Sequence, residues 1–162
     1  MTDVSAATVT AWVKLMTVSQ ALLGGIEAAL KAAGLPPLTW YDALLEIERA
    51  GEGGVRPFEL KARLLLPQYG ASRLLDRLAG AGLVVRAACD DDGRGQLIRI
   101  TEAGRRMRRA MWPVYAAQLY ATIEGRLDAE DLQRLADLLG RLEGTAEARG
   151  AGPSVRPAPP AG

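Results

Sequence analysis

Polar side chains that suit nucleic-acid recognition are interleaved with leucines between positions 67 and 80. At helical spacing, one face of this segment carries the apolar residues Ala71, Leu74, Leu75 and Leu78. The opposite face carries Gln68, Tyr69, Ser72, Arg73, Asp76 and Arg77. Arginine pairs with guanine, glutamine with adenine, and serine or tyrosine with phosphate oxygens. The pattern predicts a recognition helix for DNA, with an ordinary solvated helix face as the alternative.

A β-hairpin with a charged tip is predicted directly after this helix. Residues 83–89 and 96–101 are rich in valine, leucine and isoleucine, and residues 90–95 between them are three aspartates, two glycines and Arg94. Aspartate and glycine tolerate the positive φ angles that a tight tip needs. We therefore expect a wing beside the recognition helix, with Arg94 positioned to reach an adjacent minor groove.

The residue types that are missing exclude most enzymes. The chain has no histidine, and its single cysteine is Cys89. It therefore lacks the residues for an intrachain disulfide, a cysteine–histidine zinc site, or a Ser-His-Asp or Cys-His catalytic arrangement. The carboxylates of residues 90–92 suit a hard cation, but a hairpin tip supplies neither a pocket nor a general base. We expect no enzymatic activity, no metal site and no cofactor.

Charge is distributed unevenly along the chain. The net charge is only +1, but residues 56–109 contain 12 basic and six acidic side chains, a balance of +6, so the remaining residues carry −5. A basic centre between acidic flanks is typical of a phosphate-binding module joined to a separate assembly region. A winged-helix module that binds only proteins is the alternative, and the basic centre disfavours it.

Two helices are predicted before the basic segment. Apolar residues spaced by three and four predict a long amphipathic helix over about 6–33, which Gly34 ends. A second helix is expected to reach Ala50. Its start resembles a capping box, with Thr39 as the cap and Asp42 three residues later.

Prolines and a threonine set the expected boundaries of the next helices. Pro57 suits the first position of a short third helix, and Pro67 is expected to open the recognition helix in the same way. Thr101 is expected to cap a fifth helix over 102–125, with a kink at Pro113 because proline loses a hydrogen bond and clashes with the preceding turn. A helix of that length is too long for a core of this size to cover.

The last helix is expected to begin at Asp128 and to carry a leucine stripe made of Leu132, Leu135, Leu138, Leu139 and Leu142. The stripe and the over-long fifth helix indicate a dimer seam. The fold class is then mostly α with a small two-stranded antiparallel wing, a six-helix winged helix-turn-helix. Its expected parts are an N-terminal dimerisation helix (1–35), a DNA-binding domain (36–105), C-terminal dimerisation helices (106–144) and a disordered tail (145–162).

Membrane association is not expected from the sequence. We find no apolar run near the roughly 20 residues that cross a bilayer, and residues 1–11 lack the basic start and apolar centre of a secretory signal. The expected location is the cytoplasm.

The order of these elements resembles the MarR family of bacterial transcription regulators over residues 9–143. The residues that carry the resemblance are Ser72 to Leu78, Gly82-Leu83-Val84, Arg86, Asp92 to Gly95, Ile98, Ile100, Thr101, Glu102 and Gly104. The resemblance implies a homodimer on double-stranded DNA whose first and last helices interlock, with recognition helices in successive major grooves and wings on the flanking minor grooves. It assigns Gln68, Tyr69, Ser72, Arg73 and Arg77 to the recognition helix, and Asp92 and Arg94 to the wing, where the aspartate helps to orient the arginine. Asp76 is expected to orient Arg73 or Arg77.

The resemblance also implies a small, commonly aromatic, effector that releases the DNA. The residues positioned to line such a pocket are Trp12, Met16, Trp40 and Tyr41, and ordinary core packing is the alternative for all four. An oxidation sensor at Cys89 is disfavoured, because the aspartates beside it oppose formation of the thiolate. The expected function is a ligand-responsive homodimeric repressor of nearby genes, acting on a pseudo-palindromic operator.

Overall fold

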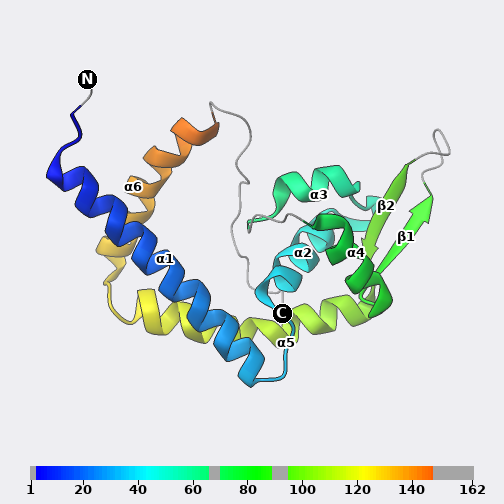
Figure 1. Cartoon of the computed structure of the whole chain (residues 1–162). Coiled ribbons are helices and arrows are strands. Elements are labelled where there is room, and N and C mark those ends of the chain that lie inside the picture. Colours follow the sequence, from blue (N-terminus) through cyan, green and yellow to red (C-terminus); the bar gives the residue numbers. More distant parts are fainter. Residues whose placement is uncertain (1–2, 66–69, 89–94, 148–162) are drawn as a thin grey trace.

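The computed structural model describes residues 3–65, 70–88 and 95–147, apart from the side chains of 144–147. Within these ranges the chain forms six α-helices and one two-stranded antiparallel sheet, as the sequence predicts (Figure 1). In chain order the elements are α1 (Ala6–Ala32), α2 (Leu38–Arg49), the 3₁₀ turn η1 (Gly51–Gly53), α3 (Pro57–Arg63), α4 (Ala71–Gly80), β1 (Val84–Ala88), β2 (Gln96–Ile100), α5 (Glu102–Leu119), the short π-helical segment η2 (Tyr120–Glu124) and α6 (Ala129–Glu147).

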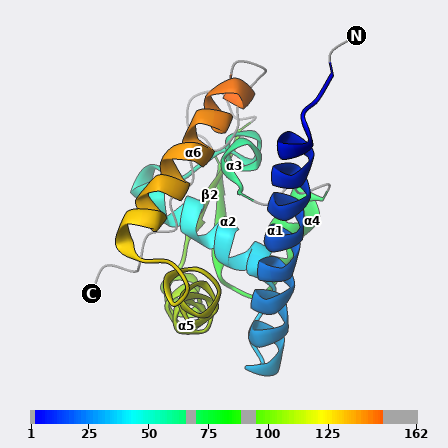
Figure 2. The same cartoon turned by 90° about the vertical axis from the view of Figure 1, so that its left-hand side faces the viewer.

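The elements form two parts, which α5 joins (Figure 1). The winged lobe consists of α2, α3, α4, β1 and β2. The helical arm consists of α1, α6 and the C-terminal half of α5, and Figure 2 views it from the side opposite the winged lobe. In that view α5 is seen end-on, and α1 and α6 extend away from it.

The core of the winged lobe combines leucines of α2, α3 and α4 with the inner face of the sheet. Its buried members are Ala43, Leu44, Ile47, Val55, Leu60, Leu64, Leu74, Leu75, Leu78, Leu83, Val84, Ile98 and Ile100. The strands pair in antiparallel register from Val84↔Ile100 to Ala88↔Gln96, which confirms the predicted hairpin strands. The helix-turn-helix and the wing therefore share one core.

A third short pairing extends the sheet, and the sequence did not predict it. Val55 and Ile98 exchange two backbone hydrogen bonds, at 3.0 and 2.8 Å. Gly54 just before the bridge has φ 72°, and a Cβ there would lie 2.9 Å from the Ile98 carbonyl oxygen. Glycine is therefore needed where the turn approaches the strand.

A second core lies between α1, α2 and α5. It buries Ile26, Leu30, Leu38, Tyr41, Leu45, Met111 and Tyr115. Helix α2 contributes to both cores, with Leu44 and Ile47 in the winged lobe and Tyr41 and Leu45 in the second core. Eight of the twelve residues of α2 are therefore buried, and this helix packs into both cores.

The predicted start of α2 is wrong, whereas both ends of α1 are confirmed. Ser5 caps α1, and Gly34 with φ 68° follows its last turn. Helix α2 begins at Leu38 instead of after a Thr39 cap, and no side chain within the helix caps it. The Glu27 carboxylate of α1 accepts a hydrogen bond from the Leu38 backbone N–H at 3.0 Å. Helix α1 thus supplies the cap across space.

Of the two helix starts predicted from prolines, one is confirmed and one is wrong. Pro57 is the first residue of α3, and the Glu59 carboxylate accepts the backbone N–H of Arg56 at 3.2 Å. Helix α4 begins at Ala71, with Gly70 as its cap residue, and not at the predicted position 67. Pro67 itself lies outside the described residues.

Thr101 caps α5 as predicted, and it also binds the backbone of residues 82 and 83. We call these three hydrogen bonds of Thr101, to Gly82, Leu83 and Gly104, the clasp. Its hydroxyl accepts the Gly104 backbone N–H at 3.0 Å and donates to the Gly82 carbonyl at 2.7 Å, while its backbone N–H donates to the Leu83 carbonyl at 3.0 Å. The first turn of α5 is thereby tied to the turn that follows α4. Pro113 lies inside α5, and the change to π-helical geometry occurs further along, at η2. A kink at Pro113 stays a prediction.

The last helix is longer than predicted. Asp128 accepts the backbone N–H of Asp131 at 2.9 Å and so stands immediately before α6, which begins at Ala129. The helix continues to Glu147, past position 145 where the tail is predicted to begin. Residues 148–162 lie outside the described residues.

Helix α1 corrects the expectation that no segment is apolar enough to span a membrane. By length and composition alone, α1 meets that criterion, and only 6% of its most apolar 18-residue window is buried within the chain. The uninterrupted apolar runs of α1 are short, and the helix reaches the criterion with polar residues interspersed. The core of a single chain therefore leaves the apolar surface of α1 uncovered, and this surface needs an apolar partner.

Candidate nucleic-acid interface

Helix α4 has the two faces that the sequence predicts. Leu74, Leu75 and Leu78 are buried in the winged core. Ser72, Arg73 and Arg77 are exposed on the other side, together with Asp76. Gln68 and Tyr69 lie outside the described residues. Three of the five predicted recognition side chains are therefore on one accessible helix face.

Asp76 has a different partner from the one expected. Its carboxylate binds the Arg86 guanidinium of β1 at 2.5 Å, and the aspartate side chain stays 64% exposed. The expectation that Asp76 orients Arg73 or Arg77 is replaced by this pair, which connects α4 to the wing. The pairing of residues ten positions apart follows from the turn between helix and strand. Arg86 is consequently neutralised locally.

The arginines at the start of α5 are also paired within the chain. Glu102 lies within salt-bridge distance of Arg105, Arg106 and Arg109, and Arg105 also approaches Glu48 of α2 at 3.7 Å. Arg108 is buried, forms a short ion pair with Glu48, and lies over the Tyr41 ring at 5.9 Å. Because these four arginines share two carboxylates, the positive charge at the start of α5 is compensated only in part within the chain.

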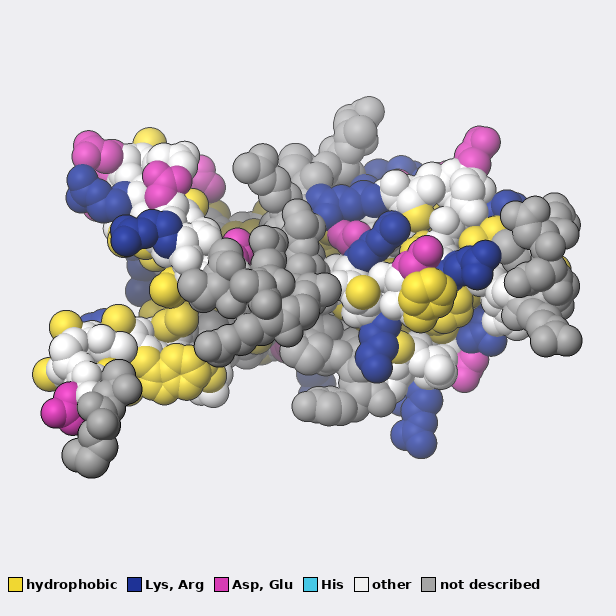
Figure 3. Space-filling view, turned by 90° about the horizontal axis from the view of Figure 1, so that it is seen from above, with side chains coloured by type: hydrophobic (Ala, Val, Ile, Leu, Met, Phe, Trp, Pro, Cys, Tyr) yellow, Lys and Arg dark blue, Asp and Glu magenta, His cyan; other side chains and the backbone are white. Residues whose placement is uncertain are grey.

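Five basic residues of the described central segment form no ion pair, and all five are exposed. They are Lys61 and Arg63 on α3, Arg73 and Arg77 on α4, and Arg99 on β2. Figure 3 shows Lys and Arg side chains spread over one face of the winged lobe. The basic residues without an ion pair are therefore concentrated on the helix-turn-helix and the wing.

Sequence reasoning missed Lys61, Arg63 and Arg99 as candidates. The sequence does indicate which basic residues are paired at the start of α5. Glu102 lies one helical turn before Arg105 and Arg106, a spacing that predicts ion pairs with both. The pairing of Arg108 with Glu48 across 60 positions had no such local signal.

The strands of the wing are in place, but its tip is not described. Ala88 and Gln96 form the last pair of the ladder. Asp92 and Arg94, the predicted minor-groove residues, lie outside the described residues, as does Cys89. Their roles stay predictions.

The four predicted effector residues do not come together within one chain. Trp12 is 60% exposed on the N-terminal half of α1, and Met16 one turn later is half-buried. Trp40 packs against the winged core, whereas Tyr41 is buried in the second core. The core-packing alternative therefore describes Trp40 and Tyr41 within a single chain.

Tyr41 belongs to an aromatic cluster with two residues of α5. Its ring centre lies 6.0 Å from that of Trp112 and 5.3 Å from that of Tyr115. Burial raises the pKa of Tyr41, and the nearby Arg108 offsets this only partly. Burial also raises the pKa of Tyr115. Both hydroxyls are therefore neutral at physiological pH.

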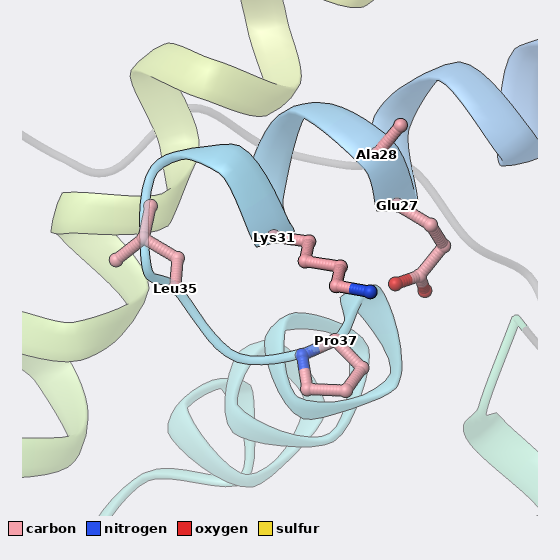
Figure 4. A pocket seen from close by; sticks show the side chains of 5 residues that line it. All are labelled: Glu27, Ala28, Lys31, Leu35 and Pro37. Atoms are coloured by element: carbon pink, nitrogen blue, oxygen red, sulfur yellow. The ribbon is translucent and has the colours of Figure 1, made fainter.

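A pocket of about 370 Å³ lies elsewhere, at the turn between α1 and α2. It is lined by Glu27, Ala28, Lys31, Leu35 and Pro37, and Figure 4 shows the Lys31 ammonium and the Glu27 carboxylate pointing toward one another beside Pro37. None of the four predicted effector residues lines it. Within the described part of the chain, no group of three or more His, Cys, Asp or Glu side chains could hold a metal ion.

The shared core, the helix pair α3–α4 and the hairpin define a winged helix-turn-helix protein. Comparison with known proteins identifies the family. Residues 33–95 match the model of the MarR family. CouR from Rhodococcus jostii RHA1, solved with bound p-coumaroyl-CoA, is 30% identical and superposes with a TM-score of 0.66, over 79% of this chain and 87% of CouR. The chain belongs to the MarR family, whose members are transcription regulators rather than enzymes.

Two further relatives are similar to this chain over part of their length or at low sequence identity. The transcriptional repressor MprA of Escherichia coli is 30% identical over 98 residues, which are 60% of this chain and 55% of MprA, so the match spans about half of that relative. Sco3205 from Streptomyces coelicolor, a MarR-family regulator solved in complex with DNA, has a TM-score of 0.78 at 22% identity and covers 94% of this chain and 96% of its own. Sco3205 therefore supports the fold.

Proposed function

We propose that the chain is a transcription regulator that binds double-stranded DNA as a homodimer. In this proposal α4 enters the major groove, with Ser72, Arg73 and Arg77 near base edges and phosphates, and Gln68 and Tyr69 complete the contact. The wing residues Asp92 and Arg94 reach the minor groove. The observation that carries the proposal is the set of five unpaired cations on α3, α4 and β2, because these can neutralise phosphates and release counterions without first breaking an ion pair.

The homodimer is supported by apolar surface that one chain leaves exposed on the helical arm. Helix α1 exposes Val9, Trp12, Val13, Leu15 and Val18, and α6 exposes Leu135, Leu138, Leu139 and Leu142, each by 36–60%. Figure 3 shows hydrophobic side chains at the surface of both projecting arms. Monomeric proteins rarely expose large contiguous apolar patches. Interlocked α1 and α6 helices from two copies would bury them, and would also account for the apolar character of α1 without a membrane.

The direction of regulation and the effector are proposed from two relatives. MprA is named a repressor, and CouR was solved with p-coumaroyl-CoA. We extend both features to this chain as repression of nearby genes from a pseudo-palindromic operator in the cytoplasm, relieved by a small aromatic ligand. Trp12 and Met16 of α1 would line such a site only beside a second copy, since a single chain leaves Trp12 mostly exposed.

A DNA-binding titration over a series of salt concentrations tests the proposal. The probes are duplexes that the protein itself enriches from a random pool. The affinity should fall with salt by ~0.9 log unit per log unit for each neutralised phosphate. Arg73→Ala should weaken binding to the enriched duplex by about 10- to 100-fold, as expected for loss of a base contact. Aromatic carboxylates and p-coumaroyl-CoA, added to the same titration, test the effector.

The matched control is Arg134→Ala, which removes an exposed arginine on α6, outside the winged lobe. It should leave DNA affinity unchanged. If the unmodified protein binds no duplex even at low salt, the chain is a winged-helix module for protein partners and the proposal is wrong.

A further inference from the structure

Phe58 is an exposed aromatic side chain that the core does not use. It is the single phenylalanine of the chain and the second residue of α3, and it is 68% exposed. Leu60 and Leu64 anchor the same segment in the winged core, with 1% and 5% exposure. Those leucines bury the inner side of α3, whereas Phe58 is the most exposed large hydrophobic side chain of the described residues.

The homodimer does not account for Phe58 either. Among the described aromatic residues, Trp12 and Tyr120 are also more than half exposed, at 60% and 61%. Both lie on the helical arm, where the proposed second copy would cover apolar surface. Phe58 lies on the winged lobe, so it needs a different explanation.

Helix α3 carries two unpaired cations after Phe58. Lys61 lies one helical turn further along the same face of α3, and Arg63 ends the helix. The one carboxylate of α3, on Glu59, is occupied with the Arg56 backbone N–H. Figure 3 shows hydrophobic side chains exposed between Lys and Arg side chains on this lobe. The partner of this face must therefore combine negative charge with apolar surface.

The backbone of double-stranded DNA has this combination, since apolar faces of deoxyribose alternate with phosphate anions along each strand. Helix α3 is the first helix of the helix-turn-helix, the one that crosses the backbone while the recognition helix enters the groove. Contacts to sugar and phosphate fix the register of a protein on the duplex without reading its sequence. An acidic protein would also satisfy the charge, but DNA is the partner already proposed for the adjacent cations of α4.

We propose that Phe58 is a DNA-contacting residue that packs its ring against a deoxyribose of the backbone, while Lys61 beside it pairs with a phosphate. This inference rests on the proposed DNA binding of the winged lobe. It adds an apolar backbone contact on α3 to the polar contacts of α4 and thereby assigns α3 a positioning role on the duplex.

Salt dependence separates the two contacts, because only a charge releases counterions. The probe is a duplex of about 30 base pairs of mixed sequence, which a backbone contact should bind without an operator. Phe58→Ala should weaken binding roughly five- to tenfold at every salt concentration and leave the slope of log affinity against log salt unchanged. Lys61→Ala should reduce that slope by ~0.9. Phe58→Leu, which keeps an apolar side chain, should restore most of the affinity.

The stability and the duplex affinity of Phe58→Ala together test the role of Phe58. Thermal unfolding of Phe58→Ala should match that of the unmodified protein, because an exposed ring contributes little to the core. Unchanged duplex affinity in Phe58→Ala, together with weaker binding in Arg73→Ala, would overturn the role of Phe58 and leave the proposed function intact. The same follows if Phe58→Ala changes the salt slope. If the unmodified protein binds no duplex, the proposed function itself fails.

Discussion

In the ion pair between Arg108 and Glu48, the arginine is more deeply buried and has fewer alternative partners than the glutamate. The arginine side chain is 6% exposed and the glutamate side chain 23%. Arg108 Nη1 has no hydrogen-bond partner, whereas Glu48 also has Arg105 within 3.7 Å. A charge that loses its partner costs most where water cannot replace it. The arginine therefore depends on the glutamate more than the glutamate depends on the arginine.

This asymmetry predicts different costs for the two single substitutions. Glu48→Gln leaves the guanidinium buried without a counterion and should lower the free energy of unfolding by about 3 kcal/mol. Arg108→Met leaves a carboxylate that water and Arg105 still reach, and should cost about 1 kcal/mol. Urea denaturation at a fixed protein concentration measures both. Glu130→Gln on α6, whose pair with Arg134 is exposed, is the control and should show no measurable change. Equal costs at positions 48 and 108 would contradict the argument.

The clasp between the α4–β1 turn and α5 requires a glycine at position 104. A Cβ on Gly104 would overlap the Leu83 carbonyl oxygen and approach the Ile100 side chain to 2.8 Å. The carbonyl belongs to the backbone that Thr101 holds, so it cannot rotate away. The clasp therefore fixes how the recognition helix is positioned on the helix that leads to the helical arm.

Gly104→Ala should consequently destabilise the protein by about 2–4 kcal/mol and weaken DNA binding, because α5 must move away from the turn. Thermal unfolding and duplex titration measure the two effects. Gly80→Ala, at the end of α4 with nothing within 4 Å of the added Cβ, is the matched control. It should leave stability unchanged or raise it by up to about 1 kcal/mol. A Gly104→Ala protein as stable as the control would show that the clasp is not rigid.

The elements also show which parts of the fold the sequence could predict. Helix α1, the cap at Thr101, the Pro57 start and the wing strands were predicted because periodicity, caps and turn residues are local signals. The Glu27 cap on α2, the Asp76–Arg86 pair and the Val55–Ile98 bridge were missed because each joins elements that only the folded chain brings together. The same limit applied to the site: α4's polar face could be read directly, but which arginines remain unpaired could not.

At the scale of the whole molecule, the exposed leucines of α6 and the apolar side of α1 require a partner. Leu138 is 49% exposed in a single chain, so a charge there should leave the fold of each chain intact. In an interlocked dimer the same charge would be buried without a counterion, at a cost of several kcal/mol. Leu138→Glu should therefore produce a folded monomer whose dimer dissociation constant is raised at least about 100-fold, equivalent to ~2.7 kcal/mol.

Analytical ultracentrifugation over a range of concentrations measures this shift, with circular dichroism to check that the helices remain. Gln133→Glu adds the same charge to α6 at an exposed polar position and should remain dimeric. Because two linked recognition helices bind far more tightly than one, the Leu138→Glu monomer should also lose most of its affinity for a two-site duplex while it keeps weak binding to a single half-site. A Leu138→Glu protein that remains dimeric would place the seam elsewhere, and the apolar side of α1 would then require another partner.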